Sequence, residues 1–397
     1  MEQTLLITKR EDKILSLLYQ NNRLIQANAY AEIGSDLEAI YIGKVKNVVS
    51  SLEAAFVEYK PNTIGFLPIR QVKNPILTNR TFDGRLAAGD EVVVQVEKEG
   101  IKTKAPSLTC NLSFTGKYSV ITTGRLGLGF STKLSVRQKE FFKKEFADRR
   151  LEAVLEQNSV GMVIRTNAGE AEDIYPIWEE VKQFLKKVDT LRQTARHRTC
   201  FSLLYQPIPA YLMGIRDLYG YSYDKMITDD EQIFNDIKST FPALEKLQLY
   251  QDEQISLSRL YSVEARLQEA LREKVWMANG AYLIIQPTEA LTVIDVNSGK
   301  NQKKGSSSEV LYQINREAAE EIALQLKLRN ISGIIIIDFI NQTHEEQDRE
   351  LLHYLTRLVN RDSVKTTVVG MTSLGLVEVT RKKINKPLWE QLKIVGK

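Results

Sequence analysis

The stretch TEALTVIDVNS, residues 288–298, places Asp295 directly after an apolar run, and GIIIIDF, residues 333–339, does the same with Asp338. Between them, residues 311–329 carry apolar side chains at helical spacing. A strand, a helix and a second strand in this order predict a βαβ unit with two parallel strands. Both aspartates would then emerge together at the carboxyl edge of a sheet, where open α/β sheets place their ligand sites.

Two carboxylates brought this close repel each other unless a cation lies between them. Asn297 adds an amide oxygen two residues after Asp295, and oxygen ligands of this kind suit magnesium. Either aspartate alone would more commonly cap a strand end or pair with a basic neighbour. Their matched context favours a metal site, so we predict Mg²⁺ held by Asp295 and Asp338, with Mn²⁺ able to substitute.

Competing catalytic motifs are absent from the sequence. The three histidines have no metal-ligand spacing such as H-x-x-x-H. There is also no G-x-S-x-G elbow and no G-x-x-x-x-G-K-[ST] loop, which argues against an esterase and against a P-loop NTPase.

The rest of the chain predicts several further compact parts, as its 397 residues allow. Residues 4–8, 13–19 and 23–28 are expected to form a β-meander, and the short strands between 39 and 109 suit a small five-stranded barrel. We expect helices at 135–158, 175–194 and 258–274, and a strand at 161–166. Ser306 with Glu309 forms a capping-box signature for the helix before Asp338.

Composition sets the broad class. Hydrophobic residues at 43% and charged residues at 26% are ordinary globular values. No apolar stretch reaches the ~20 residues of a membrane helix and no secretory leader opens the chain, so we expect a cytoplasmic protein. Cys110 and Cys200 are too few for a disulfide scaffold and are expected to be reduced. The net charge of +4 is uninformative, and the basic runs at 192–198, 300–304 and 381–383 could each be a solvated face.

Two aromatic residues of the predicted barrel, Phe56 and Phe66, fall on successive strands. Barrels of the OB type present aromatic side chains on such strands to stack on nucleic-acid bases. Burial in the core explains the pattern equally well, so the residues alone leave both interpretations open.

Taken together, these motifs resemble the ribonuclease E/G family of bacterial endoribonucleases. The segments that carry the resemblance run in the family's order over nearly the whole chain: IGKV 42–45, SLEAAFV 51–57, GFLP 65–68, VIRT 163–166, TEALTVIDVNS 288–298, ALQLKLR 323–329, IIDFI 336–340 and GLVEVTRK 375–382. The block around Asp295 is long and specific.

The resemblance implies an α+β multidomain fold. A ribonuclease-H-like scaffold would be split between residues 1–35 and 207–272. An OB-type RNA-binding barrel at 36–110 and a sensor of the RNA 5′ end at 111–206 would be inserted into it. An α/β catalytic subdomain similar to deoxyribonuclease I would follow at 273–397.

The resemblance also implies roles for individual residues. Asp295 and Asp338 match the magnesium ligands, and Asn297 matches the catalytic residue that orients the scissile phosphate. Arg165 and Thr166 match the pocket for a 5′-monophosphate, which a planar guanidinium suits. Phe56, Phe66 and Lys104 match the barrel's RNA contacts, and Lys365 stands where the family often has a basic, RNA-binding residue near the active site.

The sequence departs from the family's pattern at two places. No Cys-x-x-Cys that could share zinc across a dimer follows Cys200, so we expect no structural zinc, and any homodimer would not be linked by zinc. Asn341 stands where the family has a second acidic residue, which puts any contact from that position in doubt.

The predicted function is a magnesium-dependent endoribonuclease that hydrolyses single-stranded RNA to 5′-phosphate and 3′-hydroxyl products, in mRNA decay or rRNA processing. It would prefer 5′-monophosphorylated substrates. One alternative is a non-catalytic RNA-binding protein that retains the barrel. Another is a DNA endonuclease, suggested only by the fold analogy of the last subdomain.

Overall fold

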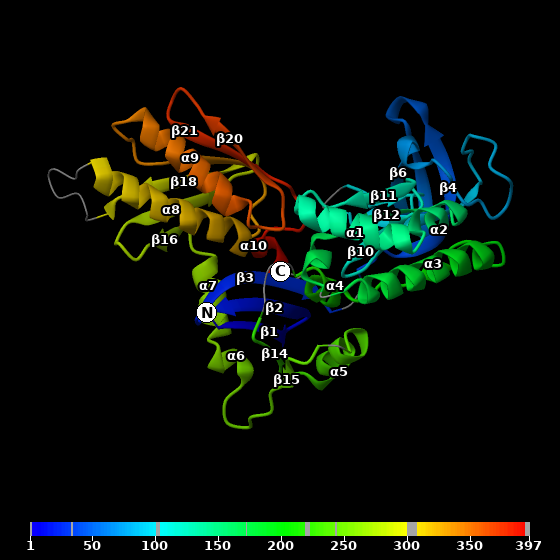
Figure 1. Cartoon of the computed structure of the whole chain (residues 1–397), viewed down its shortest axis with the longest axis horizontal. Helices are drawn as coiled ribbons and strands as arrows, with labels where there is room; N and C mark the ends of the chain where they lie inside the picture. The colour runs from blue at the N-terminus through cyan, green and yellow to red at the C-terminus, as the bar shows by residue number, and fades with distance from the viewer. Residues whose placement is uncertain are drawn as a thin grey trace. The chain divides into compact units, whose positions relative to one another are not determined.

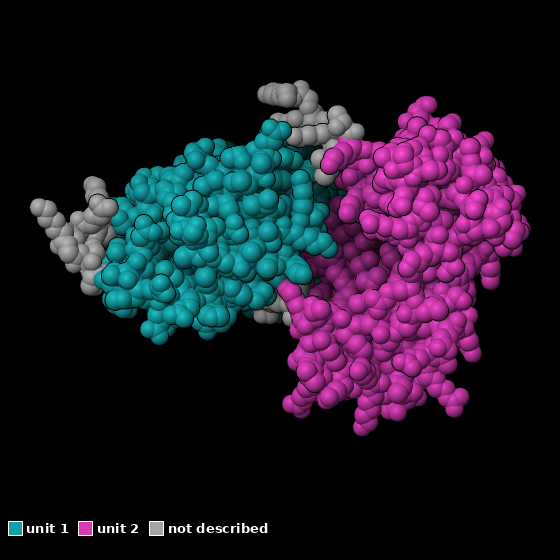
Figure 2. Space-filling model, turned by 90° about the horizontal axis from the view of Figure 1, so that it is seen from above, with its two compact units in different colours: residues 1–32, 221–397 teal, residues 33–220 magenta. Residues whose placement is uncertain are grey.

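The computed structural model describes residues 2–32, 35–100, 104–171, 173–218, 223–242, 244–299 and 308–393. The chain divides into two compact units, which Figure 2 shows in different colours. Unit 1 joins residues 1–32 to residues 221–397, and unit 2 is the intervening segment 33–220. Because both ends of unit 2 return to unit 1, unit 2 is an insertion in the sequence of unit 1.

Unit 1 contains a five-stranded sheet that pairs the start of the chain with its middle. The sheet order is β15-β14-β1-β2-β3. β2 pairs antiparallel with both β1 and β3, whereas β14 pairs in parallel with both β1 and β15. Its strands are β1 (Gln3–Arg10), β2 (Lys13–Gln20), β3 (Arg23–Ala31), β14 (Lys225–Thr228) and β15 (Leu247–Leu249), and its helices are α5 (Glu231–Thr240), α6 (Leu257–Leu260) and α7 (Val263–Ala270). The predicted β-meander is confirmed, and Asn21 and Asn22 take the positive φ of the tight turn between β2 and β3.

A second sheet of unit 1 carries both predicted metal ligands. Its order is β16-β17-β18-β19-β21-β20. Its elements are β16 (Lys274–Trp276), β17 (Tyr282–Pro287), β18 (Leu291–Asn297), α8 (Ser308–Leu328), β19 (Gly333–Asp338), α9 (Glu345–Val359), β20 (Thr366–Met371), β21 (Leu376–Arg381) and α10 (Leu388–Gln391). β18, α8 and β19 form the predicted βαβ unit, and β18 and β19 pair in parallel.

One face of this second sheet packs on α8 and α9, which lie together over the strands in Figure 1. Side chains alternate along a strand, so Ile294 and Val296 of β18 and Ile335 and Ile337 of β19 turn to the helices and are 0–5% exposed. Each buried aliphatic side chain of this kind contributes about 1.5–3 kcal/mol. The alternate residues occupy the other face of the sheet.

Unit 2 contains a closed five-stranded barrel, as the sequence predicts. β4 pairs with both β5 and β7, which closes the order β4-β5-β6-β8-β7 into a ring. Its strands are β4 (Ile40–Val49), β5 (Ala54–Lys60), β6 (Thr63–Pro68), β7 (Glu91–Lys98) and β8 (Ser107–Thr109), with 3-10 turns η1 (Ser50–Leu52) and η2 (Ile69–Gln71), and β13 (Leu203–Tyr205) extends the sheet along β4.

The remainder of unit 2 is a small α+β structure around a four-stranded sheet of order β11-β12-β10-β9. Its elements are β9 (Ser113–Thr115), β10 (Ser119–Thr122), β11 (Gly127–Phe130), α1 (Val136–Asp148), α2 (Leu151–Gln157), β12 (Gly161–Ile164), η3 (Thr166–Glu170), α3 (Tyr175–Ala195) and α4 (Ala210–Arg216). Among the helices within the described ranges, none is both long and apolar enough to cross a membrane.

Two predicted helices are each interrupted. The helix expected at 135–158 is divided into α1 and α2, because Arg150 takes a left-handed φ of 51°. The helix expected at 258–274 becomes α6 and α7, because Ser262 has φ 50°, and β16 begins at Lys274. Neither Arg nor Ser signals such a break strongly in a sequence, so tertiary packing overrides the local helical pattern.

Some sequence predictions concern residues outside the described ranges. The capping-box residue Ser306 and the basic run at 300–304 fall there. Both cysteines lie inside the described ranges and are free thiols. Burial raises the pKa of the Cys110 thiol to about 12, so this thiol is protonated at neutral pH.

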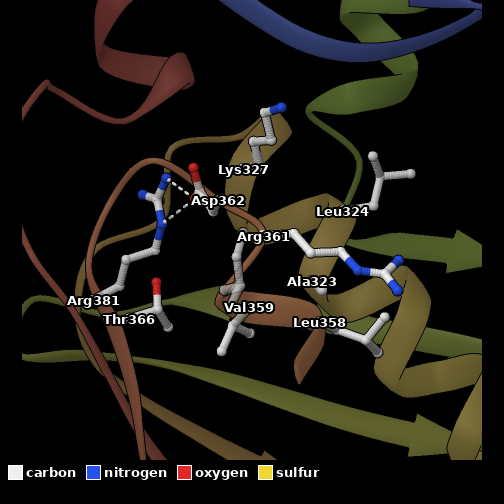
Figure 3. A pocket seen from close by; sticks show the side chains of 10 residues that line it. Ala323, Leu324, Lys327, Leu358, Val359, Arg361, Asp362, Thr366 and Arg381 are labelled. Carbon is white, nitrogen blue, oxygen red and sulfur yellow. Dashed lines mark hydrogen bonds and ion pairs between the residues drawn. The ribbon is translucent and has the colours of Figure 1, made fainter. Parts of the chain in front are cut away.

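A pocket on the helix-covered side of the second sheet is lined by Lys327, a lysine whose pKa is lowered by burial. Figure 3 shows Lys327 of α8, Asp362 after α9 and Arg381 at the end of β21 around it. Arg381 is 2% exposed in its side chain and pairs with Asp362 at 2.8 Å. Burial lowers the pKa of the Lys327 ammonium to about 8; the carboxylate of Asp362 opposes this shift, and the positive charge of Arg381 adds to it.

We predict that Lys327→Met stabilises unit 1 at pH 7 by about 2 kcal/mol. The folded-state pKa of Lys327, about 8, lies below its ordinary value of 10.5, so the charged form opposes folding below pH 8. Between pH 8 and 10.5 the unfolded state binds more protons, and the wild type gains stability as pH rises. The advantage of the variant therefore shrinks across this window.

The measurement is denaturant unfolding at pH 7 and pH 10 in a Trp178→Phe background, which leaves both remaining tryptophans in unit 1. Lys382→Met removes an exposed lysine and serves as the control, with a difference from wild type that does not change with pH. An advantage of Lys327→Met that is equal at both pH values would contradict the prediction.

Candidate functional site

Asp295 and Asp338 end up side by side. In the parallel pairing of β18 with β19, Asp295 stands opposite Asp338, and neighbouring strands lie about 4.8 Å apart. The two residues occupy equivalent positions because each follows an apolar run of its strand. The juxtaposition predicted from the sequence is therefore present in the fold.

Both carboxylates lie on the face of the sheet opposite α8 and α9. Asp295 alternates with the buried Ile294 and Val296, and Asp338 follows the buried Ile337. Asp295 is half-buried and Asp338 is exposed. A substrate can therefore approach this pair from the side that the helices leave uncovered.

Asn297 lies on the same face and donates a hydrogen bond from Nδ2 to Oδ2 of Asp295. Within the described ranges, neither Asp295 nor Asp338 forms an ion pair with a basic side chain. Two adjacent carboxylates without a cationic partner among the described residues make a region of uncompensated negative charge, to which a divalent cation is attracted.

The oxygen ligands present here suit magnesium better than a metal ion that is coordinated by protein side chains alone. The described residues contain no group of three or more His, Cys, Asp or Glu side chains arranged to hold a metal ion. Mg²⁺ is commonly bound through one or two carboxylates, several waters and substrate phosphates. Asp295 and Asp338 could hold such an ion, and the hydrogen bond from Asn297 fixes one oxygen of Asp295.

Asn315 of α8 positions the segment that follows Asp338. Its side chain is 0% exposed. It donates to the carbonyl of Ile340 at 2.7 Å and accepts from the N–H of Ile340 at 3.1 Å. This two-bond clamp ties the backbone two residues after Asp338 to the helix, and it restricts the motion of the Asp338 strand end.

Arg165 and Thr166 lie at the carboxyl ends of another pair of parallel strands, β11 and β12. Phe130 stands opposite Ile164, so Ser131 and Arg165 follow at the same sheet edge. The hydroxyls of Ser131 and Thr166 are 2.8 Å apart. The sheet thus brings a guanidinium and two hydroxyls to one edge, which is a donor set suited to an anion.

The Arg165 guanidinium is held in place by acceptors. Its Nη2 lies 2.8 Å from Oδ1 of Asp217, and its Nη1 donates to the carbonyl of Gly116. Asp217 is shared, because Arg216 also pairs with it at 2.9 Å. With 22% of its side chain exposed, Arg165 keeps access to solvent while its orientation is fixed.

Glu180 of α3 organises the loop that supports Arg165. Its carboxylate accepts hydrogen bonds from the N–H groups of Lys117 and Ser119, each at 2.7 Å, and from the Ser119 hydroxyl at 2.7 Å. The carbonyls of Gly116 and Tyr118 in the same loop accept hydrogen bonds from Arg165. Glu180 therefore acts on Arg165 through the loop backbone.

Phe56 and Phe66 stand directly opposite each other on β5 and β6. Their ring centroids are 5.9 Å apart in an edge-to-face arrangement. Both are half-buried, whereas Ala55, Val57 and Leu67 point into the barrel and are 0% exposed. The two phenylalanines thus lie on the outer face of the barrel and do not belong to its core, which resolves the ambiguity of the sequence pattern.

The structure does not bring Lys365 together with Asp338. Lys365 precedes β20, and its neighbour Thr366 pairs with Arg381, which in turn stands opposite Gly333. Gly333 and Asp338 are the two ends of β19, so roughly 16 Å of strand separates this row from the carboxylate. Lys365 is exposed, so an RNA contact from it would lie away from the carboxylate pair.

Two further positions singled out in the sequence, Lys104 and Asn341, belong to different units. Lys104 is exposed beside the barrel strand β8. Asn341 follows Asp338 by three residues. Its side chain lies near Gly375 in the turn before β21: a Cβ built on Gly375 would be 3.5 Å from Oδ1 of Asn341.

Asn315 and Glu180 were missed by the sequence analysis. Asn315 interrupts the apolar stripe of its helix beside Ile314, and a polar residue at a core position signals a buried hydrogen-bonding role. Glu180 offers no comparable signal, because an acidic residue on a long amphipathic helix normally faces solvent.

The chain matches known proteins along most of its length. A model of the ribonuclease E/G family matches residues 113–384. Ribonuclease E of Synechocystis sp. is 32% identical over 385 residues, which cover 94% of this chain and 55% of that protein. Ribonuclease G of Salmonella typhimurium is 30% identical over 363 residues, which cover 87% of this chain and 72% of that protein.

A third relative, ribonuclease E of Escherichia coli, is 28% identical, and the match covers 98% of this chain but 38% of that protein. The chain therefore spans about half the length, or less, of the ribonuclease E proteins that it matches. The match to the family model and the identity to both kinds of relative agree: this chain belongs to the ribonuclease E/G family.

Proposed function

We propose that this protein is a magnesium-dependent endoribonuclease that hydrolyses internal phosphodiester bonds of single-stranded RNA, leaving 5′-phosphate and 3′-hydroxyl ends. Its substrates would be messenger RNA undergoing decay, ribosomal RNA precursors or both, in the cytoplasm. The observation that carries the proposal is the side-by-side placement of Asp295 and Asp338 on an open sheet face, with no cationic partner among the described residues.

Asp295 and Asp338 would hold the ion, which when bound supplies Lewis-acid stabilisation of charge on the scissile phosphate. The protein's own part is positional. Asn297 orients the Asp295 carboxylate through their hydrogen bond, and Asn315 restrains the segment after Asp338. The second hydrogen of the Asn297 Nδ2 group would donate to a phosphate oxygen.

Under the same proposal, unit 2 binds the RNA. The outer-face pair Phe56 and Phe66 would stack on bases, with Lys104 and Lys365 as further RNA contacts. The edge with Arg165 and Thr166 would take a 5′-monophosphate. We assign the barrel to residues 36–110, the 5′-end sensor to 111–206, a ribonuclease-H-like scaffold to 1–35 and 207–272, and a catalytic subdomain similar to deoxyribonuclease I to 273–397.

We predict that Asp295→Asn and Asp338→Asn each lower the cleavage rate of a fluorescent 5′-monophosphate RNA by about 1,000-fold or more, because either change removes a ligand of an ion worth several kcal/mol to the reaction. Binding of the uncut RNA, measured by gel shift, stays within about threefold of wild type. EDTA abolishes cleavage by the wild type, and Mg²⁺ or Mn²⁺ restores it.

Glu289→Gln is the matched control, because it removes an exposed carboxylate at the opposite end of β18 and should leave cleavage unchanged. Equal turnover by Asp295→Asn and wild type would overturn the assignment. Tight binding without any cleavage in Mg²⁺ would instead favour a non-catalytic RNA-binding protein. Faster cutting of DNA than of RNA of one sequence would favour a DNA endonuclease.

A further prediction concerns the RNA 5′ end. In wild type, kcat/KM for a 5′-monophosphate RNA exceeds that for its 5′-hydroxyl counterpart, and Arg165→Ala lowers this ratio by about tenfold, the effect of a lost charge-assisted hydrogen bond. Cleavage of the 5′-hydroxyl RNA should remain, since the carboxylate pair is untouched.

Glu180→Gln tests the supporting loop and should lower the same ratio by a smaller factor, because an amide cannot accept all the hydrogen bonds that the carboxylate receives. Arg137→Ala removes an exposed arginine on α1 of the same unit and is expected to leave the ratio unchanged. If Arg165→Ala cuts both RNAs with the wild-type ratio, the 5′-phosphate site lies elsewhere.

A further inference from the structure

The face of the second sheet that carries the carboxylates also carries an aromatic pair, in which Trp276 is exposed and Tyr282 is half-buried. Trp276 of β16 is 62% exposed, and its ring centroid lies 5.0 Å from that of Tyr282 on β17. The ammonium of Lys274 lies 4.1 Å from the Trp276 centroid and 3.6 Å from the Tyr282 centroid. The three side chains form a cationic aromatic cluster, which we call the Trp276 platform.

Strand register ties the Trp276 platform to the carboxylate pair. Trp276 stands opposite Tyr282, and Tyr282 opposite Asn297, so the three residues form one row across the sheet. The adjacent row of the same face runs from Lys274 to Asp295 and Asp338 through Ile284. Paired residues share a face, and two strand spacings, about 10 Å, separate Trp276 from Asn297.

The chemistry of the Trp276 platform suits one ligand. An aromatic ring open to water stacks on any nucleobase, and an ammonium attracts phosphate. Within the described ranges no acidic side chain forms an ion pair with Lys274, so its charge is available to a polyanion. A lysine on the edge strand β16 also discourages strand pairing with other molecules, but that role does not require a tryptophan exposed beside it.

We propose that the Trp276 platform binds a nucleobase of single-stranded RNA next to the bond to be cut, with Lys274 contacting a neighbouring phosphate. The proposal rests on the endoribonuclease function proposed above, and it adds a subsite on the sheet that carries Asp295 and Asp338. Because stacking tolerates any base, the subsite would position the RNA without reading its sequence.

A binding experiment tests the proposal without cleavage. The variant Asp295→Asn with Trp178→Phe and Trp389→Phe retains Trp276 as its single tryptophan. Saturating it with single-stranded RNA in EDTA should quench the Trp276 fluorescence. An abasic nucleotide placed at successive positions of the RNA should remove the quenching at one position. Unchanged fluorescence with RNA shown bound by gel shift would overturn the proposal.

A cleavage experiment supplies the second measurement. In the otherwise wild-type chain, Trp276→Leu should raise KM about tenfold with kcat within about threefold, and Trp276→Phe should restore most of the affinity. Tyr175→Leu changes an exposed aromatic residue of unit 2, 66% exposed, and should change neither constant. An unaltered KM in Trp276→Leu would overturn the platform, whereas cleavage that survives Asp295→Asn would overturn the metal site and leave the fluorescence result intact.

Discussion

The parallel pairing of β18 with β19 is the constraint on which the site depends. It sets two like charges, Asp295 and Asp338, on adjacent strands, an arrangement that opposes folding unless other contacts stabilise it. Those contacts come from the opposite face, where aliphatic side chains of both strands pack on α8 and α9. Burial on one side of the sheet thus holds the two adjacent carboxylates on the other.

Unit 2 also brings polar side chains together at the carboxyl ends of two parallel strands, but there the charged side chain is an arginine. β11 and β12 are parallel, and their carboxyl ends bring Ser131, Arg165 and Thr166 together. In both units the crossover connection forces the strands into parallel register, so that residues just after two apolar runs meet at one edge. A pair of aspartates there attracts a cation, whereas a guanidinium with hydroxyls attracts an anion.

The features of the fold and of the site that could be predicted from the sequence are those that a short stretch of residues determines by itself. The apolar runs before Asp295 and Asp338 each define a strand, and their order predicts the parallel pair. The breaks at Arg150 and Ser262 follow from backbone conformations that neither residue type signals. The position of Lys365 depends on the register of β20 against β21, which a sequence motif does not specify.

The uncovered face of the second sheet determines what can reach the carboxylates. A sheet with helices on one side leaves a solvated face, and this face places Lys274 and an exposed Trp276 in rows continuous with Asp295 and Asn297. A polyanion would be attracted by the lysine and repelled by the aspartates, so under the proposed function a cation bound at the acidic pair would be needed for it to settle there. Charge on this face would therefore make productive RNA binding depend on the metal ion, whereas the aromatic contacts, which carry no charge, would act with or without it.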